Sequence, residues 1–318
     1  MRKLSATIVA VVLTLVLVLM SAGCASPAKQ VTVGNKNFTE QYLAGEMMKQ
    51  LLEAHGFTVN LVSDISTMAL REGMKAGDID ICAEYTGTAW MTHLGHVYEP
   101  GVDNNELYDM VKNEESGNGF IWLDPIWNNN TYAMASWPEF AKDNDIESLS
   151  DLAALYNSRN GEIETFVDFE FSTRPDGLPA LEKFYGFEVA KDSLMTAAPG
   201  ASLLGLENHE CEIAMVFGTD ALIAKHDWHV YLDDKAFFPP YDLSPYVRAE
   251  ILDEYPEIAD ILGELVATFP GGGGSATPEI VGEGQGVWQK LNAKVDIDKV
   301  EPEDVAHEYL VAKGLITG

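Results

Sequence analysis

The fold is decided by the stretch Gly77–Ala89, which reads GDIDICAEYTGTA. Within it a turn and a short apolar strand give way abruptly to an acid, an aromatic ring, hydroxyls and a glycine at Glu84–Thr88. In an open α/β sheet, ligands bind just past the carboxyl ends of the strands, where the chain turns. Gly87 lets the backbone turn or approach a ligand closely. Alone, this pattern favours a strand end with a surface turn and a core tyrosine, so a functional interpretation depends on the rest of the chain.

Strands and helices alternate around this stretch. Strands are predicted at 31–33 and 57–62, and Thr39 is expected to cap the helix between them. A second helix is expected to begin at Ser66 or Thr67 and to end at the glycine of the opening stretch. This order implies parallel pairing and an α/β sandwich.

The length and charge of the chain limit what it can be. With 318 residues the chain is long enough for two lobes, which we expect at 31–134 plus 239–318 and at 135–238. The 50 acidic residues outnumber the 20 basic ones, and the formal charge of −30 argues against nucleic acid as a partner. Cys82 and Cys211 lie far apart in apolar runs and are expected to be buried free thiols rather than a disulfide.

The amino-terminal segment is typical of an exported protein. Residues 1–23 have a basic start and an apolar run at 8–20 that is short for a membrane span, which predicts a signal peptide. The small residues before Cys24 resemble a bacterial lipoprotein signal, which implies that Cys24 is lipidated and becomes the mature amino terminus. Residues 24–30 would then tether the protein to the extracytoplasmic face of the cell membrane. A signal peptide that is cleaved without lipidation is the alternative.

Loops at the expected strand ends carry aromatic rings and cations. Aromatic faces attract a permanently charged, poorly hydrated cation by roughly 0.5–2 kcal/mol per ring. Lys36 and Arg174 offer charge-assisted hydrogen bonds to a carboxylate. Together these groups would suit a ligand with a quaternary ammonium at one end and a carboxylate at the other. Such rings are more often core packing, and the sequence alone does not show that they converge. The rings are Tyr85, Tyr132, Phe217 and Tyr241.

Five motifs carry a family resemblance. They are Gly34–Gln41 (GNKNFTEQ), Glu84–Thr88 (EYTGT), Asn129–Ala133 (NNTYA), Arg174–Pro179 (RPDGLP) and Phe237–Tyr241 (FFPPY). In this order they resemble the glycine betaine/choline-type substrate-binding proteins of ABC importers. The resemblance covers essentially the whole mature chain. It implies a two-lobed α/β fold of the periplasmic-binding-protein type II kind, in which two crossing strands join the lobes and a hinge closes them on the ligand.

The resemblance also implies roles for individual residues. The rings of the motifs would form a cage for the cation, while Asn130 would face the cation with its amide. Phe217 stands where the family commonly has a tyrosine, and the missing hydroxyl leaves the exact ligand open. The implied ligand-binding residues are Lys36, Thr88 and Arg174 for the carboxylate, Tyr85, Tyr132, Phe217 and Tyr241 for the cage, and Asn130.

The function expected from these features is solute capture. The chain would be a lipid-anchored, monomeric receptor, without enzymatic activity, cofactor or metal, that binds glycine betaine or a related quaternary ammonium compound. It would deliver this ligand to an ABC permease and its ATPase. A choline- or carnitine-preferring receptor is the alternative within the family, although choline has no carboxylate to engage Lys36 and Arg174.

A secreted metal-dependent hydrolase is the alternative from another class. His93 and His96, and likewise His226 and His229, form His-x-x-His pairs. No pair of cysteines at ligand spacing and no His-Glu-x-x-His run accompanies them, so surface or capping roles are favoured.

Overall fold

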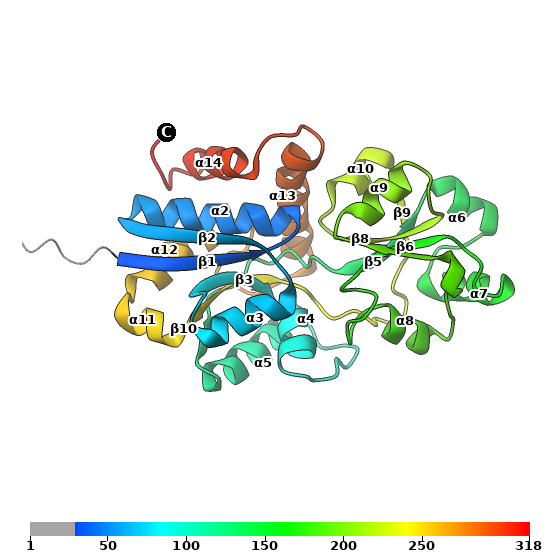
Figure 1. Ribbon diagram of the computed structural model, residues 1–318, viewed down its shortest axis with the longest axis horizontal. Helices are drawn as coiled ribbons and strands as arrows, with labels where there is room; N and C mark the ends of the chain where they lie inside the picture. Colours follow the sequence, from blue (N-terminus) through cyan, green and yellow to red (C-terminus); the bar gives the residue numbers. More distant parts are fainter. Residues whose placement is uncertain (1–28) are drawn as a thin grey trace, which may run out of the picture.

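Two lobes, each built around a five-stranded sheet, lie side by side in the computed structural model, which describes residues 29–318 (Figure 1). The expected signal peptide and the lipidation site at Cys24 lie outside the described residues. Within 29–318, no helix combines the length and the apolar character needed to cross a membrane.

The first lobe contains a mixed sheet in the order β2-β1-β3-β10-β4. The parallel pairing predicted from the strand–helix alternation is present between β1 and its neighbours β2 and β3. The late strand β10 joins the sheet antiparallel to β3 and β4, which places chain from the far end of the sequence in the middle of this lobe. The strands are β1 (Lys29–Lys36), β2 (Phe57–Ile65), β3 (Ile81–Tyr85), β4 (Phe120–Trp122) and β10 (Leu243–Arg248).

Helices cover this sheet. Helix α2 packs against this sheet. Its apolar side chains Leu43, Met47 and Leu51 recur at helical spacing, so they lie on one face of the helix, and all three are fully buried. The structure corrects the expected cap of α2: Phe38 is the extended N-cap residue, and the Thr39 hydroxyl instead donates to Asp296 at 2.6 Å. The helices are α2 (Thr39–Ala54), α3 (Thr67–Ala76), α4 (Thr86–Thr88), η1 (Ala89–His93), α5 (Asn104–Gly117), α11 (Ala249–Glu254), α12 (Glu257–Val266), α13 (Pro278–Asp296) and α14 (Pro302–Ala312).

The second lobe repeats this plan with the order β7-β6-β8-β5-β9. Its strand β6 pairs in parallel with β7 and β8, while β5 runs antiparallel to β8 and β9. The strands are β5 (Tyr132–Ser136), β6 (Thr165–Asp168), β7 (Leu194–Ala197), β8 (Ile213–Phe217) and β9 (His229–Val230). The helices are α6 (Pro138–Asn144), α7 (Leu149–Ser158), α8 (Leu178–Tyr185), η2 (Lys191–Ser193), α9 (Ala201–Glu207) and α10 (Ala221–His226).

Two crossing segments, residues 123–131 and 231–242, connect the lobes. They hydrogen-bond to each other from Asn130 N to the Tyr241 carbonyl at 2.8 Å, and Ile126 N of the first segment also donates to the carbonyl of Leu243, the first residue of β10, at 2.7 Å. The crossings therefore form one paired unit rather than two independent linkers.

Both cysteines in the described part of the chain are buried and free, as predicted. Cys82 lies in β3, and Cys211 lies just before β8 in the other lobe. Disulfide bonding therefore contributes nothing to the described fold.

Candidate functional site between the lobes

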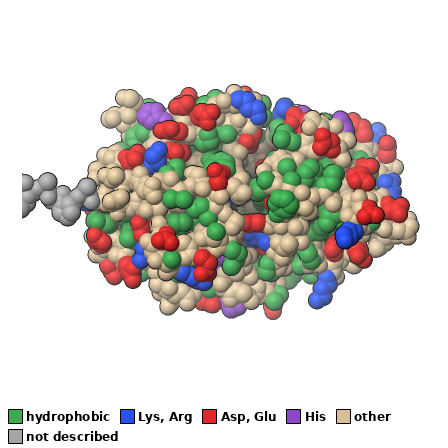
Figure 2. Space-filling model, viewed as in Figure 1, with side chains coloured by type: hydrophobic (Ala, Val, Ile, Leu, Met, Phe, Trp, Pro, Cys, Tyr) green, Lys and Arg blue, Asp and Glu red, His purple; other side chains and the backbone are tan. Residues whose placement is uncertain are grey.

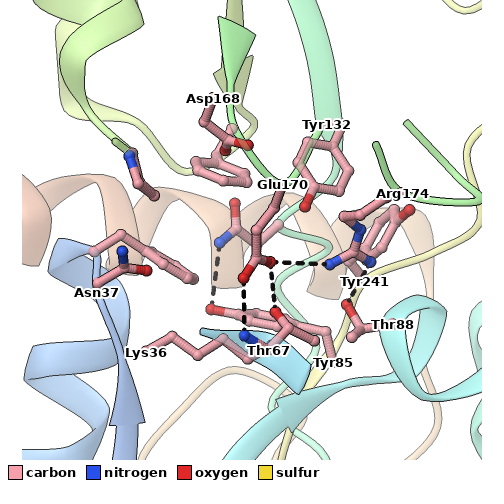
Figure 3. Close-up of a pocket in the computed structure, with 14 residues that line it drawn as sticks. Lys36, Asn37, Thr67, Tyr85, Thr88, Tyr132, Asp168, Glu170, Arg174 and Tyr241 are labelled. Atoms are coloured by element: carbon pink, nitrogen blue, oxygen red, sulfur yellow. Dashed lines mark hydrogen bonds and ion pairs between the residues drawn. The ribbon is translucent and has the colours of Figure 1, made fainter. Parts of the chain in front are cut away.

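All eight residues singled out as ligand-binding from the sequence line one cavity of about 30 Å³ between the lobes. Figure 3 shows side chains from both lobes pointing toward this common space. The eight residues are Lys36, Tyr85, Thr88, Asn130, Tyr132, Arg174, Phe217 and Tyr241.

Strand ends position these side chains. Lys36 and Tyr85 are the last residues of the parallel strands β1 and β3, so both lie at the edge of the first sheet where ligands bind in α/β folds. In the second lobe, Phe217 ends β8 and is paired with Tyr132, the first residue of the antiparallel strand β5. Because β5 runs antiparallel to β8, the first residue of β5, Tyr132, lies at the same edge of the sheet as the last residue of β8, Phe217.

The rings contact one another around the cavity. The centroid of the Tyr132 ring lies 5.2 Å from that of Phe217 and 5.4 Å from that of Tyr241, the latter edge-on at 90°. Burial raises the pKa of Tyr85, Tyr132 and Tyr241 well above the ordinary value, so all three rings remain neutral phenols. The faces of such neutral rings attract a cation through their quadrupole.

Close approach of the chain at Gly87 lets Tyr241 reach this cluster. A β-carbon at Gly87 would lie 2.8 Å from the ring of Tyr241 and 2.9 Å from the Pro240 carbonyl. The glycine that opens the turn after β3 is thus required by packing against the second crossing segment.

Both basic side chains of the site are already paired with buried acids. The Lys36 ammonium lies 2.5 Å from a carboxylate oxygen of Glu84. The Arg174 guanidinium donates twice to Asp176, each time at 2.8 Å, and also to the Thr88 hydroxyl at 3.2 Å. Their positive charge is therefore largely compensated before any ligand arrives.

Asp176 connects the guanidinium to the aromatic cluster. It accepts a hydrogen bond from the Tyr241 hydroxyl at 2.5 Å as well as those from Arg174. Burial would raise the pKa of Asp176, but the charge and hydrogen bonds of Arg174 outweigh it and hold that pKa below its ordinary value. Asp176 is therefore an anion that orients two of the expected ligand-binding side chains.

Two further acids border the cavity itself, Asp168 and Glu170. Asp168 ends β6, and burial raises its pKa from 3.8 to about 6. Glu170 reaches across to the first lobe, where its carboxylate accepts hydrogen bonds from the backbone N–H and the hydroxyl of Thr67 at 2.8 and 2.7 Å. Acidic groups are thus as much part of this site as basic ones.

A buried carboxylate, Glu40, holds the base of the site. One of its oxygens accepts from the Tyr85 hydroxyl at 2.8 Å and from the side-chain amides of Asn128 and Asn130 at 3.0 and 3.1 Å. Burial is the main reason that the pKa of Glu40 is raised from 4.5 to about 7. The position of the Asn130 amide is set by this carboxylate.

A larger hollow of about 440 Å³ adjoins the site. Phe38, Asn130 and Phe217 border both spaces, and the rings of Phe38 and Phe217 stack with centroids 5.2 Å apart. The hollow also reaches the acids Glu40 and Asp296. The aromatic cavity is thus walled by a fifth ring, Phe38.

Sequence reasoning missed six residues that line the aromatic cavity. Asn37 and Phe38 directly follow Lys36 inside the first motif. Asp168 is the last residue of β6 and Glu170 lies two residues beyond it, at the carboxyl end of a strand, where α/β sheets commonly bind ligands. The missed residues are Asn37, Phe38, Thr67, Asp168, Glu170 and Pro199.

The two His-x-x-His pairs have local partners. The ring of His96 lies 2.8 Å from Glu114, and that of His226 lies 2.8 Å from Glu207. His93 faces the buried Glu84 at 3.5 Å. Over residues 29–318, no three His, Cys, Asp or Glu side chains are grouped so that they could hold a metal ion.

Comparison with known proteins places this geometry among solute receptors. A family model described as the substrate binding domain of ABC-type glycine betaine transport systems matches residues 29–312. The glycine-betaine-binding protein of Pseudomonas aeruginosa is 30% identical over 297 residues, which cover 92% of this chain and 90% of that protein. The glycine betaine-binding protein YehZ of Escherichia coli is 32% identical over 294 residues, which cover 90% of this chain and 92% of that protein.

A solved structure agrees with the sequence relatives. The crystal structure of a glycine betaine/carnitine/choline ABC transporter protein superposes with a TM-score of 0.66 at 25% identity. The match covers 90% of this chain and 99% of that one. Fold and sequence therefore point to the same group of proteins.

Proposed function

The chain belongs to the family of substrate-binding domains of ABC-type glycine betaine transport systems, and we propose that it captures a quaternary ammonium compound of the glycine betaine class between its lobes. It is thus the solute-binding component of an ABC importer. The eight residues expected from the sequence would form the ligand site, and the rings Tyr85, Tyr132, Phe217 and Tyr241 would form the cage.

One observation carries the proposal: four rings from separate chain segments converge on one cavity. One lies at a strand end of the first lobe, two lie at strand ends of the second lobe, and one lies in the second crossing segment. A quaternary ammonium has no N–H to donate, so hydrogen-bond acceptors alone would hold it poorly. Several neutral ring faces would each contribute roughly 0.5–2 kcal/mol. Contact with rings from both lobes would also couple ligand capture to closure of the lobes.

Delivery would take place at the extracytoplasmic side of the membrane. The receptor would act as a monomer, held there by a lipid on Cys24, and would pass its ligand to the permease. The strongly acidic surface would keep it soluble and away from anionic headgroups apart from this anchor.

Within the ligand class, the sequence motifs favour glycine betaine, and choline and carnitine are alternatives that the acids paired with Lys36 and Arg174 leave open. Lys36, Thr88 and Arg174 supply the donors that a ligand carboxylate would need. A structurally similar protein is described as a glycine betaine/carnitine/choline transporter, so all three ligands merit testing.

The proposal is tested by calorimetric titration of the chain from Ser26 onward. Glycine betaine, choline, carnitine and proline would be titrated separately, with proline as the control that carries a carboxylate but no quaternary nitrogen. Saturable binding of at least one quaternary amine, tighter than that of proline, is the expected result. The absence of measurable binding of all three quaternary amines would refute the proposed ligand class.

A further inference from the structure

Glu170 places the protein's own carboxylate inside the ligand cavity. It belongs to the second lobe, two residues beyond the end of β6, and its side chain is 31% exposed. One carboxylate oxygen accepts from the Thr67 N–H at 2.8 Å, and the other accepts from the Thr67 hydroxyl at 2.7 Å. The second oxygen also lies 3.7 Å from the Arg174 guanidinium (Figure 3).

These partners are the ones that an anionic ligand group would seek. Thr67 is the first residue of the ten-residue helix α3, whose first-turn N–H groups carry partial positive charge. Among residues 29–318, Arg174 is the one arginine whose guanidinium lines the cavity. A helix N-terminus, a hydroxyl and a guanidinium together form an anion subsite, and Glu170 fills it.

The small volume of the cavity and the excess of acidic groups around it agree with an anion subsite that is already occupied. The cavity of about 30 Å³ has room for about two water molecules, whereas ligand pockets usually exceed roughly 300 Å³. Lys36 and Arg174 face four carboxyl groups in or beside the cavity, so acids outnumber bases around it. Those acids are Glu84, Asp168, Glu170 and Asp176.

We propose that Glu170 is a specificity-determining residue that occupies the anion subsite with an internal carboxylate and so discriminates against ligands that carry one. A zwitterion such as glycine betaine must displace Glu170 from Arg174 before its own carboxylate can bind that guanidinium. A cation without a carboxylate leaves Glu170 in place and is attracted by the negative charge of Glu170. The hydrogen bonds that Glu170 accepts from Thr67, which bridge the lobes, are then kept. This inference rests on the proposed function, because it presumes a quaternary ammonium ligand.

The test compares the ratio of two affinities across variants. Glu170→Gln keeps an oxygen that can accept from the Thr67 N–H but removes the charge, so it should fold. Glu139→Gln, which removes an exposed charge from α6 in the same lobe, is the matched control. Titration with glycine betaine and with choline should show that Glu170→Gln shifts the affinity ratio toward glycine betaine by about tenfold, because the competing anion is gone. Glu139→Gln should leave the ratio unchanged.

A ratio that stays the same in Glu170→Gln, or that shifts toward choline, would overturn the inference. A second readout needs no ligand: amide hydrogen exchange of the segment containing Thr67, measured in Glu170→Ala. The lost bridge should make this segment exchange faster than in the parent, and unchanged exchange would also count against the role of Glu170. If neither ligand binds any variant, the proposed ligand class fails, and the exchange measurement still decides whether Glu170 holds the two lobes at Thr67.

Discussion

Glu40 shows how much of the site depends on a residue that no ligand need touch. The residue is only 1% exposed, and its carboxylate fixes the hydroxyl of Tyr85 and the amide of Asn130 by accepting from both. Burial away from water is the largest influence on this carboxyl, and the hydrogen bonds that it accepts only partly offset that burial. A charge on this group is therefore poorly compensated, and the neutral acid is favoured.

This imbalance predicts a pH dependence of stability. The folded-state pKa of Glu40, about 7, lies above the ordinary 4.5, so the folded protein binds more protons than the unfolded chain between these values. The free energy of unfolding should therefore fall as pH rises through this window. Glu40→Gln removes the titration, and relative to the parent its free energy of unfolding should rise by up to about 3 kcal/mol between about pH 5 and pH 8.

Urea unfolding of both proteins at the two pH values measures this difference. Glu139→Gln serves as the control for loss of one acidic side chain. A Glu40→Gln variant whose stability runs parallel to that of the parent across the range would contradict the assigned burial of an ionisable group.

The aromatic and basic residues of the site were predictable from the sequence because most of them lie in motifs that resemble those of a known family. It did not predict the acids that neutralise Lys36 and Arg174. Asp176 stands two residues after Arg174, yet nothing in the spacing shows that the side chains turn back on each other. Glu84 and Lys36 are brought together only by the pairing of β1 with β3. Pairing between strands is a tertiary property, which the local sequence does not encode.

The crossing segments are the elements on which the relative position of the lobes depends. Asp242, in the second crossing, accepts from the backbone N–H groups of Asn128 and Asn129 in the first at 3.1 and 2.9 Å. Its other oxygen accepts from the Asn104 side chain at 2.6 Å. Asp242 is fully buried, so these hydrogen bonds have no replacement by water.

Removing these acceptors should destabilise the protein. Asp242→Ala leaves two backbone donors and an amide unsatisfied, and we expect a loss of roughly 3–5 kcal/mol in the free energy of unfolding. Asp242→Asn keeps an oxygen for the backbone donors, and rotation of the Asn104 amide can satisfy the new NH2 group, so the loss should be ~1–2 kcal/mol. Urea unfolding of the two variants decides, and equal losses would show that side-chain volume rather than hydrogen bonding matters there.

Element types were largely predictable, whereas their ends were not. Strand β6 ends at Asp168, because the carboxylate of Asp168 accepts from the Phe171 N–H at 2.6 Å and turns the chain. That turn is what aims Glu170 at the first lobe. Periodic apolar residues identify a strand, but a side-chain hydrogen bond that ends it leaves no periodic signal.

At the scale of the whole molecule, the excess of acidic residues acts against compactness. Figure 2 shows acidic side chains scattered over the visible face of both lobes. With a formal charge of −30, mutual repulsion should be strong at low ionic strength and weaker once salt screens it. We expect the free energy of unfolding to rise by on the order of 1 kcal/mol between about 0.05 M and about 0.5 M NaCl.

Urea unfolding in NaCl and in KCl at matched ionic strength measures this effect. Screening predicts the same rise in both salts. A stability that falls with salt, or that responds to one of the two cations only, would contradict the explanation by general repulsion.

The most direct test of the central claim is to exchange the ligand's positive nitrogen for carbon. Glycine betaine and choline would be titrated beside tert-butylacetate and tert-butylethanol, which have the same shapes without the cationic charge. Rings that bind through cation–π attraction should favour each ammonium compound over its carbon analogue by about tenfold or more. Equal affinities within each pair would contradict the cage, because the site would then be selecting shape alone.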